Sequence, residues 1–196
     1  MNTVADLTLA GALVAVWITA GLLADALPGA RTALELRRRS ATLSLLIAAG
    51  AAIFVSVAII TALLPGESAI PAAALASAVP ALVVLTVSLR RLTQVRRGAG
   101  AFDSAPLTPV PPALRAAAAH PMVLVPLQVT GLATLLGVPI AGRLVTVPGA
   151  DLAGIGITVV GAAVVAIGIR AAVRHSRLSL LAFAPLGRVR MPANLR

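Results

Sequence analysis

Three polar side chains lie close together in an apolar stretch of the chain, with a spacing that could form a small site. Gln128 follows Pro126 by two residues, and one helical turn separates Thr130 from Thr134. Proline has no N–H to donate inside a helix, so it frees a backbone carbonyl one turn earlier. A broken helix with amide and hydroxyl groups can bind a polar substrate or hydrogen-bond to a neighbouring helix. Gln128, Thr130 and Thr134 are therefore a candidate substrate site or, alternatively, an interhelical polar contact.

The ionisable side chains that could take part in chemistry lie near the ends of apolar stretches. We expect Asp25 at the membrane interface, paired with Arg31 or with the run of arginines at 37–39. The alternative is a coupling acid exposed to a cavity, because acids at membrane depth often mark ion or substrate paths. His120 and His175 are also expected at the charged side, which excludes paired-histidine haem ligation inside the membrane.

Patterns typical of enzymes are absent from the sequence. The chain has no cysteine, which excludes disulfides, thiolate catalysis, iron–sulfur clusters and cysteine zinc sites. It contains no phosphate-binding loop, no zinc-protease motif and no serine-hydrolase motif in the required context. We therefore expect no enzyme activity, no catalytic residue, no metal site and no cofactor.

Composition indicates a membrane protein. Hydrophobic residues make up 59% of the 196 residues and charged residues 11%, whereas about a quarter of the residues of a soluble domain are charged. The net charge is +10, and all of the positive side-chain charge comes from arginine, since the chain has no lysine. These arginines flank apolar stretches and the chain has few aromatic residues, so we expect a lipid bilayer as the partner and no nucleic acid.

Five apolar stretches are long enough to approach or exceed the thickness of a bilayer core. They predict helices at about 4–27, 41–64, 71–89, 122–141 and 152–169. The fold class is thus an all-α polytopic membrane helix bundle with a single transmembrane domain over residues 1–184. Whether the first helix fully spans the membrane stays open. Pro-Gly turns at 65–68 and 147–151 predict two similar hairpins, and whether these are a true repeat also stays open.

Two basic segments connect or follow the predicted helices. Residues 90–121 form a Pro-rich loop, in which 108–112 should be extended polyproline II and 113–120 one or two helical turns. This loop is either a stiff linker or a docking segment for a partner. Residues 170–196 form a basic tail that begins with a short interfacial amphipathic segment.

The arginines predict the orientation of the chain. Fifteen of the sixteen lie in segments 28–40, 90–121 and 170–196. Because cytoplasmic loops are enriched in basic residues, these segments should be cytoplasmic, with the N-terminus outside and the C-terminus inside a cell inner (plasma) membrane. We expect contacts with anionic phospholipids at Arg37, Arg38, Arg39, Arg90, Arg91, Arg170, Arg174 and Arg177.

Small residues recur at helical spacing and predict close helix packing. Such residues let two helices approach closely in lipid, within one bundle or between subunits. The stripes in the second and fifth predicted helices are Ser44, Ala48, Ala52 and Ser56, and Gly154, Gly161 and Gly168. Shorter stripes occur in the first and fourth, at Gly11, Ala15 and Thr19, and at Ala133, Gly137 and Ala141.

These patterns favour a non-catalytic integral membrane subunit or scaffold that packs against larger membrane partners or against itself. The alternative is a small permease, channel or half-transporter that acts as an oligomer. A transporter should have a polar cavity near Gln128 and the kink expected at Pro80. A scaffold should have a filled bundle and an uncovered face of small residues.

The predicted orientation is tested by labelling. Single cysteines introduced at Ser68 and Ser104 should react with an impermeant reagent from opposite sides of the membrane, because a predicted span separates them. Labelling of both positions from the outside would contradict the topology.

Overall fold

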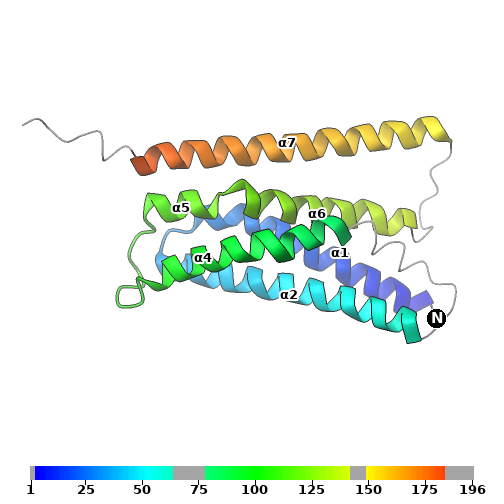
Figure 1. The fold of residues 1–196 in the computed structure, drawn as a ribbon, viewed down its shortest axis with the longest axis horizontal. Coiled ribbons are helices and arrows are strands. Elements are labelled where there is room, and N and C mark those ends of the chain that lie inside the picture. The colour runs from blue at the N-terminus through cyan, green and yellow to red at the C-terminus, as the bar shows by residue number, and fades with distance from the viewer. Residues whose placement is uncertain (1–2, 64–77, 142–148, 184–196) are drawn as a thin grey trace, which may run out of the picture.

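The computed structural model describes residues 3–63, 78–141 and 149–183, and helices make up most of them. The helices lie side by side as an elongated bundle, with α7 along one edge and α2 along the other (Figure 1). The α-helices are α1 (Thr3–Ala26), α2 (Ala33–Leu63), α4 (Leu89–Gly100), α5 (Pro112–Ala118), α6 (Pro121–Ala141) and α7 (Ala150–Phe183). A 3-10 turn, η1 (Leu27–Gly29), follows α1, and a π-helical segment, η2 (Val84–Ser88), precedes α4.

Five helical segments are long and apolar enough to cross a membrane. They are residues 8–29, 33–57, 78–100, 112–137 and 154–182. The described residues contain no β-strand, only one isolated bridge between Thr32 and Pro109. The all-α class and the five-helix bundle of a multi-pass membrane protein are thereby confirmed.

The second helix begins eight residues earlier than predicted. Thr32 accepts a hydrogen bond at its side-chain oxygen from the Glu35 N–H, at 3.2 Å, and the Glu35 carboxylate accepts one from the Arg31 N–H at 2.7 Å. These contacts satisfy backbone N–H groups at the start of α2, which have no partner inside the helix. The predicted start at residue 41 was wrong because arginines 37–39 end the apolar stretch without ending the helix.

The segment 90–121 is mostly helical rather than an extended linker. The helix that includes Ala78 continues through Arg90 and Arg91 to Gly100, and α5 forms inside the second half of the segment. Only residues 101–111 and 119–120 lie outside helices. The expected short helix is confirmed, whereas the end of the third helix at residue 89 was wrong. Pro111, with φ −57° and ψ 145°, adopts the expected polyproline II conformation.

The non-helical part of this segment docks on the chain's own second helix. The Thr108 carbonyl accepts a hydrogen bond from the Ala33 N–H, and the Pro106 carbonyl accepts one from the Leu34 N–H, both at 3.0 Å. In return the Val110 N–H donates to the Arg31 carbonyl at 3.0 Å. The Pro-rich loop therefore caps the first turn of α2 with backbone carbonyl groups.

Helix α7 is much longer than the predicted fifth helix. It runs unbroken from Ala150 to Phe183, since no glycine or proline interrupts residues 169–183. The basic segment from residue 170 is thus a direct continuation of this helix, and the predicted end at 169 was wrong. The first predicted outer turn, at 65–68, lies outside the described residues, and so do residues 147 and 148 of the second. The question of a repeat therefore stays a hypothesis.

The single tryptophan occupies the centre of the core. Trp17 of α1 is fully buried and contacts α2 and α6. A Cβ added at Gly50 of α2 would lie 2.7 Å from the indole ring, and one added at Gly131 of α6 would lie 3.1 Å from the Trp17 carbonyl. The Phe54 ring lies 6.1 Å from the indole, centroid to centroid. Gly50 thus makes room for the indole, and Gly131 lets α6 approach the backbone of α1 at the same residue.

A hydrogen bond between helices satisfies the carbonyl that Pro126 frees. Pro126 has no N–H for the Met122 carbonyl, and the Ser88 hydroxyl of η2 donates to that carbonyl instead, at 2.8 Å. Ser88 is fully buried at the end of the π-helical turn. The irregular turn and the proline helix are thus joined by one polar contact in an apolar interior.

Loss of this contact should destabilise the bundle. Ser88→Ala leaves the Met122 carbonyl without this partner, which should cost about 1–3 kcal/mol of the free energy of unfolding. In a Pro126→Ala background the same change should cost less, because residue 126 can then donate to Met122. Detergent-induced unfolding of the four proteins measures both effects.

The matched control is Ser56→Ala, since the exposed Ser56 hydroxyl donates to the Ala52 carbonyl of its own helix. This variant should change stability by less than about 0.5 kcal/mol. Equal losses for Ser56→Ala and Ser88→Ala would show that the interhelical bond has no special role.

Candidate functional site: a basic cleft at one end of the bundle

The two threonines of the predicted polar site on α6 hydrogen-bond within their own helix. The Thr130 hydroxyl donates to the Pro126 carbonyl at 2.7 Å, and the Thr134 hydroxyl donates to the Thr130 carbonyl at 2.6 Å. Both threonines are fully buried, so neither hydroxyl proton remains for a substrate or another helix. Gln128 is half-buried beside Gly21 of α1, whose added Cβ would lie 3.5 Å from the Gln128 Cα.

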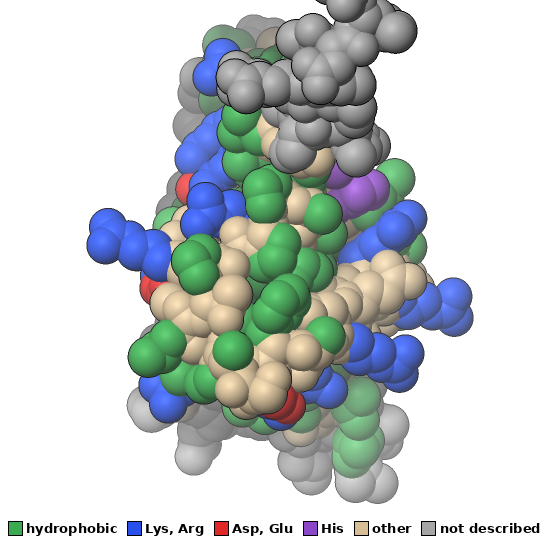
Figure 2. Space-filling model, turned by 90° about the vertical axis from the view of Figure 1, so that its left-hand side faces the viewer, with side chains coloured by type: hydrophobic (Ala, Val, Ile, Leu, Met, Phe, Trp, Pro, Cys, Tyr) green, Lys and Arg blue, Asp and Glu red, His purple; other side chains and the backbone are tan. Residues whose placement is uncertain are grey.

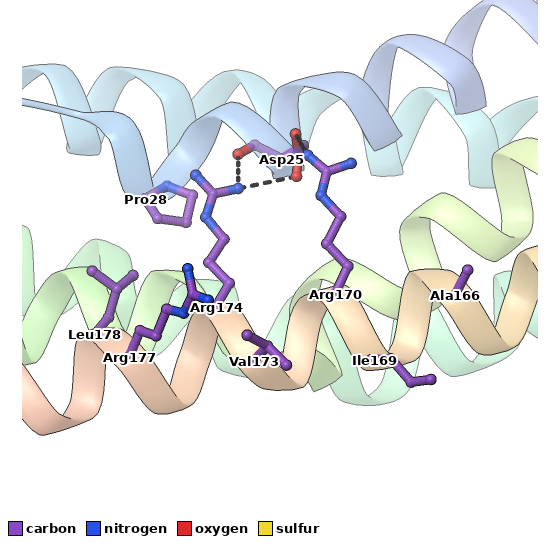
Figure 3. A pocket seen from close by; sticks show the side chains of 9 residues that line it. All are labelled: Asp25, Pro28, Ala166, Ile169, Arg170, Val173, Arg174, Arg177 and Leu178. Atoms are coloured by element: carbon purple, nitrogen blue, oxygen red, sulfur yellow. Dashed lines mark hydrogen bonds and ion pairs between the residues drawn. The ribbon is translucent and has the colours of Figure 1, made fainter.

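Asp25 makes the ion pairs that connect the end of α1 to α7 (Figure 3). Its carboxylate accepts hydrogen bonds from Arg170 at 2.8 Å and from Arg174 at 3.0 Å. Arg174 also donates to the Asp25 backbone carbonyl at 2.8 Å. The predicted pairing with Arg31 or with residues 37–39 was wrong, because α7 brings its own arginines against the end of α1.

The arginines at 37–39 have other contacts. Arg37 pairs with Asp103 in the loop after α4. Arg39 pairs with Glu35 one turn earlier and donates to the Ala26 carbonyl at 2.6 Å. These pairs fasten the end of α1, the start of α2 and the Pro-rich loop to one another.

Four of the eight arginines expected at lipid therefore have carboxylate partners inside the protein: Arg37, Arg39, Arg170 and Arg174. Within the described part of the chain, the side chains of the other four make no ion pair; these are Arg38, Arg90, Arg91 and Arg177. Seen from the end of the bundle, arginine side chains spread around the rim of the molecule (Figure 2). Lipid contact stays a prediction for all eight.

A cleft of about 810 Å³ lies beside the Asp25 ion pairs. Its wall on α7 carries arginines and aliphatic side chains, and α1 and η1 supply the opposite wall (Figure 3). It is lined by Asp25, Pro28, Ala166, Ile169, Arg170, Val173, Arg174, Arg177 and Leu178. The candidate site thus lies at the arginine-rich end of the bundle and not at Gln128.

The two histidines meet beside this end of α7. Their ring centroids are 4.9 Å apart, and His175 Nδ1 lies 2.9 Å from the Ala116 carbonyl of α5. His120 Nδ1 accepts a hydrogen bond from the Met122 N–H at 3.2 Å. Among the described residues no group of three or more metal-ligating side chains exists. The histidine pair is therefore best described as a contact that joins α7 to the junction of α5 and α6.

The small-residue stripes of α2 and α7 do not pack inside the described bundle. A Cβ added at Gly154, Gly161 or Gly168 would have no atom within 4 Å. On α2 the side chains of Ala48, Ala52 and Ser56 are exposed, and only Ser44 is half-buried. The α7 glycines thus have no close neighbour among the described residues, and the α2 stripe is mostly exposed; packing of both stripes against another subunit stays a prediction.

Other glycines make the close contacts. Gly21, Gly50 and Gly131 lie against α6, the Trp17 ring and the Trp17 backbone, and Gly98 of α4 lies against Leu114 of α5. Spacing did not reveal them, because none belongs to a stripe of small residues: Gly50 and Gly98 face a bulky side chain, and Gly21 and Gly131 face the backbone of another helix. The single tryptophan was a sequence signal for a small residue opposite it, the position that Gly50 fills.

No protein-family model, no curated protein and no solved structure matches this chain. The described residues define a class of protein, a multi-pass helix bundle with an arginine-rich end.

The Asp25 contacts predict an energetic coupling between α1 and α7. A double-mutant cycle of Asp25→Asn and Arg174→Gln should give a coupling of about 0.5–1 kcal/mol in the free energy of unfolding. The value is modest because both side chains are about one-third exposed, at 31% and 33%.

The same cycle with Arg38→Gln in place of Arg174→Gln supplies the control. Arg38 is exposed and forms no ion pair with described residues, so its coupling to Asp25 should be close to zero. Equal coupling in both cycles would indicate general charge effects rather than a specific contact.

Proposed function

We propose that this protein is a non-catalytic membrane subunit or scaffold, and that the outer face of α7 binds a transmembrane helix of a larger membrane protein. The observation that carries the proposal is the uncovered glycine stripe of α7. Only 6% of the most apolar window of this helix is buried, against 28–39% for the other four spanning segments. Helix α7 is thus the segment with the most surface left for a partner.

The glycines of α7 lower the stability of this helix unless a partner packs against them. Glycine in a helix interior is less favourable than alanine by about 1 kcal/mol. Gly154, Gly161 and Gly168 are spaced by seven residues, so they share one face of the helix over about 21 Å. No described side chain fills that face. A second helix packed closely against it would offset the cost through van der Waals contact.

A second uncovered stripe of small residues supports a scaffold with two partners rather than a complex with one. Ala48, Ala52 and Ser56 are exposed on α2, and α2 and α7 lie at opposite edges of the bundle in Figure 1. Two such faces allow the protein to contact neighbours on both sides. These neighbours are other subunits in the proposal, and a second copy of the chain is the alternative that the experiment below distinguishes.

The proposed setting is the cell inner membrane, with the N-terminus outside and the C-terminal end inside. Its support is the distribution of arginine, which gathers in three segments between and after the apolar stretches. The Arg37–Asp103 pair links the first two of these segments, and Arg170 of the third pairs with Asp25 near the end of α1. The end of the bundle with these pairs is cytoplasmic in the proposal.

The competing function, a small permease, channel or half-transporter, has less support. It needs a polar path at mid-membrane near Gln128 and Pro80. The hydroxyls of Thr130 and Thr134 donate within α6, and the cleft described above lies at Asp25. These contacts favour a scaffold.

The test is Gly161→Leu in the full-length protein. Its side chain would occupy the uncovered face and force a partner helix away, so the variant should lose co-purifying membrane protein in mild detergent. The free energy of unfolding of the protein alone should be unchanged or slightly raised, because nothing lies within 4 Å of that position. Affinity purification with mass analysis of the complex separates a larger partner from a second copy.

Two variants control this experiment. Val159→Leu adds bulk about 200° around the helix from Gly161 and should leave the partner bound. Gly50→Ala should instead lower stability by about 1–3 kcal/mol, because its Cβ would meet the Trp17 ring. If Gly161→Leu kept every partner, α7 would face lipid and the proposal would fail.

A further inference from the structure

The cleft between α1 and α7 has a strongly cationic wall. Arg170, Arg174 and Arg177 contribute three guanidinium groups and Asp25 a single carboxylate. Arg170 and Arg174 share that carboxylate, and Arg177 forms no ion pair with any described residue. Two positive charges are therefore in excess, and the guanidinium groups keep free N–H donors for an anion. Figure 3 shows Arg177 projecting from α7 beside Arg174.

The same wall has an apolar part. Ile169 and Val173 line the cleft and are 60% and 44% exposed, and Ala166 continues this surface one turn further along α7. Beyond Arg170, the arginine closest to the apolar part of α7, Ile169 and Ala166 extend this apolar surface by about 6 Å of helix rise. A ligand that covers the whole wall needs an anionic head and a hydrocarbon body. A free phosphate ion would cover only the charged part.

We propose that this cleft binds one anionic phospholipid, with its phosphate groups at Arg170, Arg174 and Arg177 and its acyl chain along Val173, Ile169 and Ala166. Guanidinium groups bind phosphate through two parallel hydrogen bonds, and basic pockets between membrane helices suit anionic headgroups. The charge excess favours a headgroup with two negative charges, as in diphosphatidylglycerol. Asp25 holds two of the arginines in position before the lipid arrives. This site is independent of the glycine face of α7.

Native mass spectrometry of the full-length protein in mild detergent tests the proposal. Diphosphatidylglycerol should bind about tenfold more tightly than phosphatidylglycerol, and phosphatidylcholine more weakly still. Arg177→Gln should weaken diphosphatidylglycerol binding by about tenfold, because a charged hydrogen-bond donor is lost. Arg177 makes no described ion pair, so the variant should fold normally, as circular dichroism would verify.

Arg96→Gln is the matched control, with the same change of charge at an exposed arginine of α4 outside the cleft. It should weaken binding by less than about twofold. Equal weakening by both variants would overturn the proposed site, because it would show that the lipid is attracted to basic surface in general.

Inorganic phosphate distinguishes the two sources of phosphate. In the proposal it fails to displace the lipid at equal concentration, and shorter acyl chains weaken binding. Displacement by inorganic phosphate, or an affinity that does not depend on acyl-chain length, would show that the cleft binds a free anion. Either result would overturn the proposal of a bound phospholipid.

Discussion

The packing of Trp17 is the constraint on which the bundle depends. The largest buried side chain of α1 lies where α2 and α6 cross it, and Gly50 supplies the space. Since lipid is as apolar as the helix surfaces, burial of apolar area drives little association there, and close van der Waals contact has to hold the helices. The indole against Gly50 and the α1 backbone against Gly131 provide such contacts with two neighbouring helices. The order of α1, α2 and α6 follows from them.

Helix α7 is held by a different kind of interaction. Its described contacts with the bundle include the Asp25 ion pairs and the contact of His175 with α5, all near the arginine-rich end. A Cβ added at Gly154, Gly161 or Gly168 of the same helix would have no described atom within 4 Å. Charge thus attaches one end of α7, while its apolar length presents exposed surface. This division is consistent with the two proposals, a lipid bound at the basic end of α7 and a protein partner along its apolar length.

The sequence predicted the number and class of the helices, because apolar length responds directly to bilayer thickness. Helix ends were predicted less well. Arginines end the membrane-embedded stretch, but they are good helix formers, and so α7 continues through Arg170. The start of α2 was readable from the spacing of Thr32 and Glu35, a capping pattern. The partner of Asp25 was not readable, since Arg174 lies 149 residues away and meets it only through the fold.

The polar groups in the bundle interior also explain where chemistry remains available. In an apolar interior an unpaired carbonyl is costly, and Ser88 and Thr130 hydrogen-bond to the carbonyls of Met122 and Pro126. These hydroxyls therefore serve the backbone, and a ligand would have to compete with it. The guanidinium groups of α7 differ, because one carboxylate satisfies only part of their hydrogen-bonding capacity. The buried hydroxyls of this bundle thus bond to its own backbone, whereas the guanidinium groups at its basic end keep N–H donors that a ligand can use.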